Sequence, residues 1–142
     1  MADSKTFNSS DLIVVFGALH LTGFSDGSYI EITYNNPWWT HKAGADGEVA
    51  SVRSNRLDAN VKFTLLQTSM DNDALMAFLL SDFTANTPLP LLIKDLNGLT
   101  LFECAKARID KVPDTAYSTD PTDREWNIFC PRLIPFVGGN LV

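Results

Sequence analysis

Cysteine is scarce in this sequence: only Cys104 and Cys130 occur among 142 residues. Each lies in an apolar, strand-like segment, where a free cysteine behaves as a small hydrophobic residue. A zinc site or a disulfide framework would need closely spaced cysteines or more of them. Both residues are therefore predicted to be buried thiols without a chemical role.

Long apolar runs are absent as well. The longest, residues 12–21 and 88–93, fall well short of the ~20 residues that a membrane-spanning helix needs. Residues 1–11 are polar and lack the apolar segment of a secretory signal. We therefore expect synthesis in the cytoplasm and no membrane insertion by this chain.

Basic residues are in the minority. Eleven Lys and Arg against 17 Asp and Glu give a formal charge of -6, which argues against a protein that binds duplex DNA through its phosphates. A hydrophobic content of 45% is too high for a disordered chain. The length is typical of one domain, so residues 1–142 are predicted to form a single globular unit.

Apolar residues recur mostly with a period of two, which indicates half-buried strands. Residues 12–21 and 28–34 flank the turn-forming segment Gly23–Gly27 and are predicted to form a hairpin. Residues 91–95 and 99–109 flank Asn97-Gly98, a step that favours tight hairpin turns. Further strands are predicted over residues 58–67 and as a pair within 125–137, where Pro131 and Pro135 require an edge or bulged position.

One segment has helical periodicity. Ser69 can cap a helix over about residues 70–83, and Asn86, Pro88 and Pro90 follow its end. Five of its residues make one apolar stripe along the helix: Leu75, Met76, Leu79, Leu80 and Phe83. The predicted fold is mainly β, a barrel or sandwich with this helix at its side.

Three motifs invite a catalytic or metal-binding interpretation, and each has a simpler one. Gly23–Gly27 matches the G-x-S-x-G pattern around a nucleophilic Ser25, but that motif needs a strand followed by a helix, and here strands are expected on both sides. His20 and His41 with Asp46 or Glu48 lack the spacing of a metal site. Asp71-Asn72-Asp73 lacks the glycine and glutamate of a calcium loop and suits a helix start.

Two segments suggest assembly with other chains. Residues 36–56 form a long connection that contains Trp38 and Trp39, and connections of this length are usually functional. Two adjacent indoles cannot both point into one small core from an extended segment, and tryptophan is enriched at interface centres. The alternative is one buried ring and one lying on the surface. At the other end, Leu141 and Val142 follow Gly138-Gly139 and leave an apolar terminus exposed.

The order of segments resembles the tail tube proteins of contractile-tailed bacteriophages, especially those of Pseudomonas phages, and is related to tube subunits of bacteriocins and type VI secretion systems. The resemblance spans nearly the whole chain. It is carried by residues 44–48 (GADGE), 63–69 (FTLLQTS) with Asn72-Asp73, 93–102 (IKDLNGLTLF) and Glu125-Trp126.

The resemblance implies a non-enzymatic structural subunit of the virion, without cofactors, that assembles as six-membered rings stacked into a hollow tube for DNA. Implied partners are further copies of the chain, the sheath protein, the tape measure protein and baseplate or terminator proteins. The N-terminal arm, the 36–56 loop and the C-terminal tail would make subunit contacts. Candidate interface residues are Trp38, Trp39, His41, Asp46, Glu48, Arg53, Arg56, Leu141 and Val142. Candidates to face the lumen or the sheath are Glu31, Thr33, Lys62 and Thr64.

Other functions remain open at this stage. A terminator, baseplate piece or tube cap would form single rings. A monomeric ligand-binding barrel would have a discrete apolar cavity. A small esterase would depend on Ser25.

Overall fold

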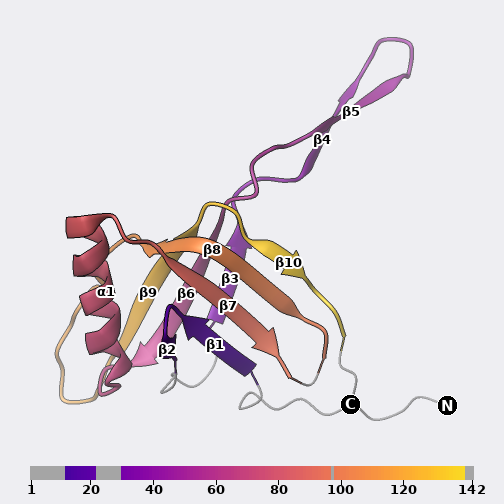
Figure 1. Ribbon diagram of the computed structural model, residues 1–142. Helices are drawn as coiled ribbons and strands as arrows, with labels where there is room; N and C mark the ends of the chain where they lie inside the picture. The colour runs from indigo at the N-terminus through magenta and orange to yellow at the C-terminus, as the bar shows by residue number, and fades with distance from the viewer. Residues whose placement is uncertain (1–11, 22–29, 97, 140–142) are drawn as a thin grey trace.

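A computed structural model describes residues 12–21, 30–96 and 98–139 of the chain (Figure 1). Its elements follow in the order β1 (Leu12–Phe16), β2 (Leu19–His20), β3 (Ile30–Tyr34), β4 (Trp39–Ala43), β5 (Val49–Arg53), β6 (Ala59–Leu66), α1 (Asp71–Ala85), β7 (Leu89–Asp95), β8 (Leu101–Ile109), β9 (Asp123–Cys130) and β10 (Ile134–Phe136). The prediction of a mainly β fold with one helix is confirmed.

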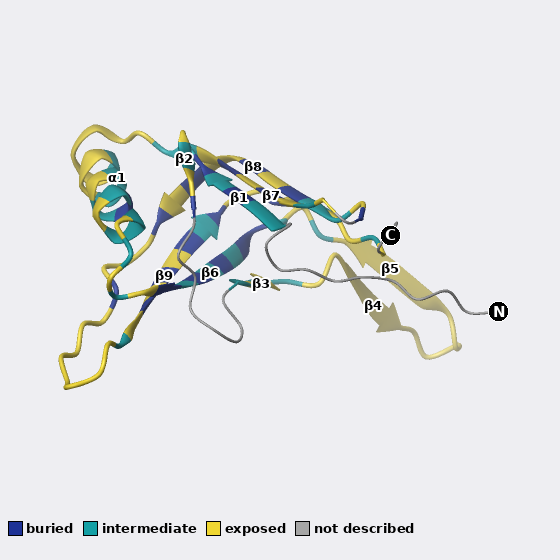
Figure 2. Cartoon of the chain, turned by 90° about the horizontal axis from the view of Figure 1, so that it is seen from below, coloured by how far each residue is buried: buried dark blue, intermediate teal, exposed yellow. Residues whose placement is uncertain are grey.

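Eight strands form one antiparallel sheet in the order β2-β1-β7-β8-β9-β6-β3, and β10 also pairs with β8. The two halves of this sheet meet where Arg108 and Ile109 of β8 pair with Phe129 and Ile128 of β9. Buried side chains from both halves belong to one hydrophobic cluster. In Figure 2 the buried residues run along the strands of both halves, so the sheet bends around a shared core.

Strand β6 shows how the sequence builds this core. Val61, Phe63 and Leu65 are fully buried, whereas Lys62 and Thr64 between them are only half-buried. The strand pairs with β3 on one side and β9 on the other, so each inward side chain has neighbours from both partners. The period-two pattern in the sequence identified the correct face.

The predicted hairpin between residues 12–21 and 28–34 is wrong. The chain reverses earlier, at Gly17, whose φ of 64° is favourable only for glycine and whose N–H donates to the Pro90 carbonyl at 2.7 Å. As a result β1 pairs with β2 and β7, while β3 pairs with β6. The predicted turn, Gly23–Gly27, lies outside the described residues.

The other strand predictions agree better with the structure. Strands β7 and β8 form the hairpin predicted around Asn97-Gly98. Both strands expected within 125–137 are present, but β9 pairs with β6 and β8, and β10 pairs with β8. Pro135 lies in β10, which has β8 as its partner, consistent with an edge position.

The helix α1 begins two residues after Ser69, whose hydroxyl accepts a hydrogen bond from the Asp71 N–H at 3.3 Å. It ends at Ala85, and the next residue, Asn86, adopts the left-handed conformation. Leu75 is fully buried and Met76 and Leu79 pack against the core, but Leu80 and Phe83 are 55% and 87% exposed, so the core covers only part of the apolar stripe. In the described part of the chain no helix is long and apolar enough to cross a membrane.

Cys104 and Cys130 are buried free thiols, as predicted. The two thiols are hydrogen-bonded to each other, which lowers the pKa of Cys104 to about 6. The same contact, together with burial, raises the pKa of Cys130 well above its usual range.

Candidate assembly interface

Residues 36–56, expected to be a loop, contain a two-stranded hairpin that we call the arm, formed by β4 and β5. Its register runs from Trp39 opposite Arg53 to Ala43 opposite Val49, and its turn contains Gly47 at a φ of 81°. The arm projects away from the rest of the protein (Figure 1). All ten of its strand residues are exposed, as their colour in Figure 2 shows.

An isolated two-stranded hairpin is only marginally stable in water, because it has no hydrophobic face to bury. The arm nevertheless carries large apolar side chains: Trp39, Val49 and Val52 are 53%, 60% and 54% exposed. Such exposure on a projecting element is typical of a surface that another chain covers.

The two faces of the arm differ in chemistry. Residues opposite each other in the register share a face, so Trp39, His41 and Arg53 lie on one side, where the His41 Nδ1 and the Ser51 Oγ are 2.9 Å apart. Lys42 lies on the other side. The arm therefore presents an aromatic and basic face near its base.

The base of the arm is attached to the sheet through Tyr34 and Trp38. Their rings pack edge to face at 5.8 Å, and the Tyr34 hydroxyl donates to the Leu133 carbonyl at 2.8 Å. Burial is the main reason that the pKa of Tyr34 rises to about 12, so its hydroxyl keeps its proton at neutral pH. The Ser54 N–H donates to the Trp38 carbonyl at 2.7 Å and closes the base.

Asp58 joins the two chain segments that enter and leave the arm. Its carboxylate accepts hydrogen bonds from the Asn35 Nδ2 at 3.0 Å, on the entering side, and from the Arg56 Nε and Nη2, both at 3.2 Å, on the leaving side. The Asn35 hydrogen bond, followed by Arg56, lowers the pKa of Asp58 below its usual value. The Asp58 carboxylate thus holds the entering and leaving segments of the arm together.

Asp58→Asn is expected to reduce the stability of the protein at pH 7. A carboxyl group whose pKa is lower in the folded state stabilises it above the unfolded pKa of about 3.9, and this contribution is lost as the pH falls through the folded pKa. The difference between wild type and variant should therefore be constant from about pH 6 upward and shrink in acid below about pH 4. Urea unfolding at a series of pH values measures it.

Asn35→Ala serves as the companion variant, because it removes the largest cause of the pKa shift and keeps the carboxylate. It should weaken the same acid dependence without abolishing it. A difference between Asp58→Asn and wild type that is unchanged down to pH 2 would contradict the assignment.

A pocket of about 220 Å³ lies beside the base of the arm. The residues that line it include Trp38, Trp39, Arg53, Ser54 and Arg132. A parallel bridge between Leu57 and Arg132 brings the segment after β9 to this place. Within the described residues neither arginine of the pocket forms an ion pair.

The predicted lumen or sheath residues share the polar face of β3 and β6. Glu31 lies opposite Lys62 in the register, and the Lys62 Nζ contacts the Glu31 Oε2 at 3.9 Å and the Glu125 Oε1 at 3.4 Å. Thr64, on the same face of β6, lies opposite Glu125 of β9. Thr33 belongs to the same side of β3, as the alternating burial of that strand indicates.

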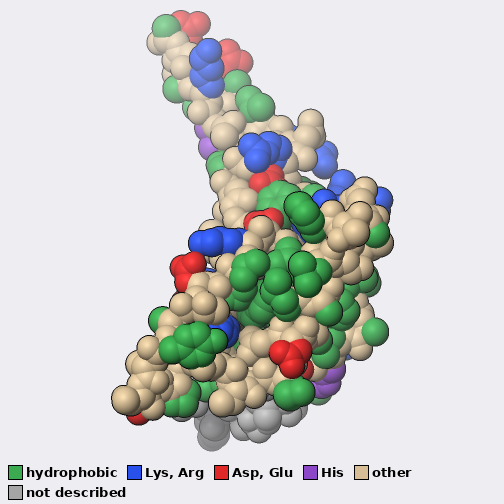
Figure 3. Space-filling view, turned by 90° about the vertical axis from the view of Figure 1, so that its left-hand side faces the viewer, with side chains coloured by type: hydrophobic (Ala, Val, Ile, Leu, Met, Phe, Trp, Pro, Cys, Tyr) green, Lys and Arg blue, Asp and Glu red, His purple; other side chains and the backbone are tan. Residues whose placement is uncertain are grey.

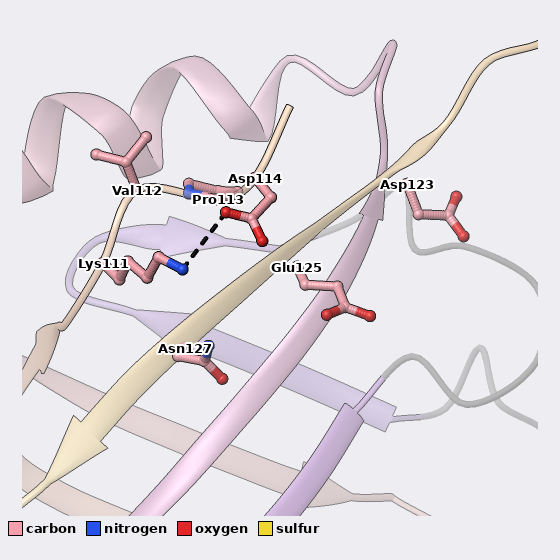
Figure 4. Close-up of a pocket in the computed structure, with 7 residues that line it drawn as sticks. All are labelled: Lys111, Val112, Pro113, Asp114, Asp123, Glu125 and Asn127. Carbon is pink, nitrogen blue, oxygen red and sulfur yellow. Dashed lines mark ion pairs between the residues drawn. The ribbon is translucent and has the colours of Figure 1, made fainter. Parts of the chain in front are cut away.

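A shallow pocket of about 190 Å³ continues this polar face along β9. Figure 4 shows Glu125 and Asn127 on the strand and Lys111 and Asp114 on the segment that follows β8, with the last two joined by an ion pair of 3.4 Å. Since Lys62 also reaches Glu125, the pocket and the β3–β6 face form one continuous polar surface.

The residues of the metal hypothesis are dispersed. His20 ends β2, whereas His41 lies in the arm and Asp46 and Glu48 lie at its turn. In the ranges 12–21, 30–96 and 98–139, no three His, Cys, Asp or Glu residues are placed so that they could hold a metal ion. Ser25, Leu141, Val142 and the N-terminal segment lie outside the described residues.

Two residues of this region were missed by sequence reasoning. Asp58 follows the long connection as an ordinary polar residue at the start of a strand, and only the hydrogen bonds that its carboxylate accepts reveal its role. Arg132 lies 79 positions after Arg53, and no sequence pattern links the two. One sequence signal was available for Asp58: it is a charged residue directly before a buried strand, where an unpaired charge would be costly.

Comparison with known proteins places this geometry in context. Residues 15–138 match the family described as Bacteriophage PhiTE tail tube protein. A relative, the "Structural protein ORF10" of Pseudomonas phage KPP10, is 30% identical over 123 residues, covering 84% of this chain and 71% of that protein.

Solved structures share the fold at low sequence identity. The tube-terminating cap of the anti-feeding prophage has a TM-score of 0.63 at 13% identity, covering 96% of this chain and 94% of that one. The sheath/tube terminator of the extracellular contractile injection system PVC gives 0.62 at 15%, covering 96% and 100%. A chain of the PVC sheath-tube complex gives 0.59 at 14%, covering 92% and 91%.

Proposed function

We propose, from the premise that this chain belongs to the bacteriophage PhiTE tail tube protein family, that its copies form rings that stack into the hollow tube of a phage tail. Family membership confirms the resemblance found in the sequence and makes the protein a structural component related to the tail tube. The proposal adds the assembly: six copies to a ring, and a lumen through which DNA passes into the host.

The observation that carries the proposal is the exposed arm. Its strands contribute nothing to the core, and its large apolar side chains Trp39, Val49 and Val52 are more than half exposed. A second copy in the next ring would cover them, and the arm would then bridge rings along the tube. Leu80 and Phe83 on α1 add further apolar surface that an assembly would bury.

The charge of the chain agrees with a conduit for DNA. A net charge of -6 disfavours tight binding to phosphates, so a DNA strand would pass without adhering. We assign the polar face of β3 and β6, with Glu31, Thr33, Lys62 and Thr64, to a surface of the tube, either the lumen or the sheath side. The sheath, the tape measure protein and the baseplate or terminator proteins are the proposed partners, and the virion is the proposed location.

A terminator or cap is the second candidate, favoured by TM-scores of 0.63 and 0.62 to proteins with those descriptions. Such a protein would close a tube and would form a single ring. The two candidates therefore differ in whether rings of this chain stack on one another.

Negative-stain electron microscopy of the concentrated, purified protein tests the proposal directly. We expect hollow tubes of uniform width. Isolated rings that never stack would support the terminator, and a protein that stays monomeric at high concentration would contradict both candidates.

A further inference from the structure

The pocket at the base of the arm has the chemistry of a carboxylate-binding site. Arg53 and Arg132 supply two guanidinium groups, which bind carboxylates through paired N–H donors, and the indoles of Trp38 and Trp39 form apolar walls. Tryptophan and arginine are also the residue types that contribute most at protein interfaces. With no ion pair to either arginine from the described residues, the pocket has an unmatched positive charge.

The opposite charge is found at the other end of the same arm. Asp46 and Glu48 lie at the turn, which is held by a 2.7 Å hydrogen bond from the Gly44 N–H to the Glu48 carbonyl. Both acids are exposed, and neither forms an ion pair with a described residue. Figure 3 shows acidic side chains at the tip of the arm, with a basic side chain beside them, and mainly basic side chains around its base.

The tip of an arm cannot reach the pocket of its own chain. Glu48 and Arg53 are five residues apart along the arm, and at about 3.3 Å per residue an extended strand keeps them about 17 Å apart. In the paired register of β4 and β5 the turn lies at the far end of the arm from Arg53. An acidic tip that enters this pocket must therefore come from another copy.

We propose that the acidic tip of the arm, Asp46 and Glu48, docks in the Trp38, Trp39, Arg53 and Arg132 pocket of a second copy. This inference rests on the proposed function. A contact from the tip of one copy to the base of another is head-to-tail, and such contacts can repeat from ring to ring without forming a closed assembly. It specifies which two surfaces meet between rings, and it implies that all these contacts have the same direction along the tube. Lys42, on the other face of the arm, takes no part in it.

Charge reversal tests the contact. Arg53→Glu with Arg132→Glu reverses the pocket, and Asp46→Lys with Glu48→Lys reverses the tip. Each double variant is expected to lower the yield of tubes, measured by sedimentation and electron microscopy, at least about tenfold, because like charges would meet across the interface. All four positions are exposed, so the circular dichroism spectrum and the Tm should stay close to those of wild type.

The chain that carries all four substitutions is the decisive variant. Its tip is basic and its pocket acidic, so tubes should return to within about twofold of the wild-type yield. Lys42→Glu, a charge reversal on the other face of the same arm, is the matched control and should assemble normally. Equal loss in Lys42→Glu, or no recovery in the fourfold variant, would overturn the tip-to-pocket contact.

A cross-link gives a second, independent measurement. Glu48→Cys with Arg53→Cys places two thiols too far apart to join within one chain, so oxidised tubes should yield ladders of linked chains on denaturing gels. Monomer alone from oxidised tubes would count against the contact. If wild-type tubes form while the reversed variants also assemble fully, the contact is wrong and the proposed function stands; if wild type never forms tubes, both fail.

Discussion

Replacing residues 40–52 by a two-residue Asn-Gly turn is expected to give a chain that folds normally and no longer forms tubes. Trp39 and Arg53, which pair in the register, would then be joined by a turn of the length that suits an antiparallel hairpin. The closing hydrogen bond from the Ser54 N–H to the Trp38 carbonyl would be kept. Since every removed side chain is exposed, the core loses nothing.

Two measurements separate folding from assembly in this deletion. The Tm and the near-ultraviolet circular dichroism should match those of wild type, because the sheet, α1 and the Asp58 attachment are intact. The sedimentable fraction should fall to background at concentrations where wild type forms tubes. Tubes of normal length from the shortened chain would remove the arm from the assembly and with it the main support for the proposed function.

Phe63→Ala is expected to cause the largest loss of stability of any single substitution considered for this chain. Phe63 is fully buried on β6, between Ile30 of β3 and Trp126 of β9 in the register. Removing a buried phenylalanine ring costs about 3–5 kcal/mol, the sum of lost burial and the cavity that remains. That is a large part of the about 5–15 kcal/mol by which a typical domain is stable.

The neighbouring residue provides the matched control for Phe63. Thr64 lies on the same strand but faces outward, so Thr64→Ala should change the free energy of unfolding by less than about 1 kcal/mol. Equilibrium unfolding in guanidinium chloride measures both variants. A loss below about 1 kcal/mol for Phe63→Ala would mean that β6 does not form the centre of the core.

Local sequence patterns predicted those parts of the fold that depend on residues close together in the sequence. The alternation of Val61, Phe63 and Leu65 with polar residues follows from the geometry of a strand and identified the buried face of β6. The hairpin of β7 and β8 was predictable because the Asn97-Gly98 step joins the two strands directly. The helix was predictable because its capping residues and apolar spacing lie within a few turns of the chain.

The incorrect predictions concern segments whose contacts in the fold are made with residues far away in the sequence. The run over residues 12–21 and the strand at 28–34 are adjacent in sequence, yet β7 and β6 are their partners. On α1, helical spacing groups Leu80 and Phe83 with Leu75, but only Leu75 is fully buried, because spacing does not reveal how much sheet a helix covers. The sequence of residues 36–56 indicates a loop, because its two strands pair only with each other and lack a buried face.

The sequence by itself determined the fold class and the family, and it identified residues 36–56, which hold two of the three tryptophans, as the candidate assembly surface. Tertiary structure alone decided where that surface lies and what it contains. It placed Asp58 between Asn35 and Arg56, and it brought Arg132 to Arg53 across 79 positions. Contacts between residues so far apart depend on the course of the whole chain, which no local pattern of side chains records.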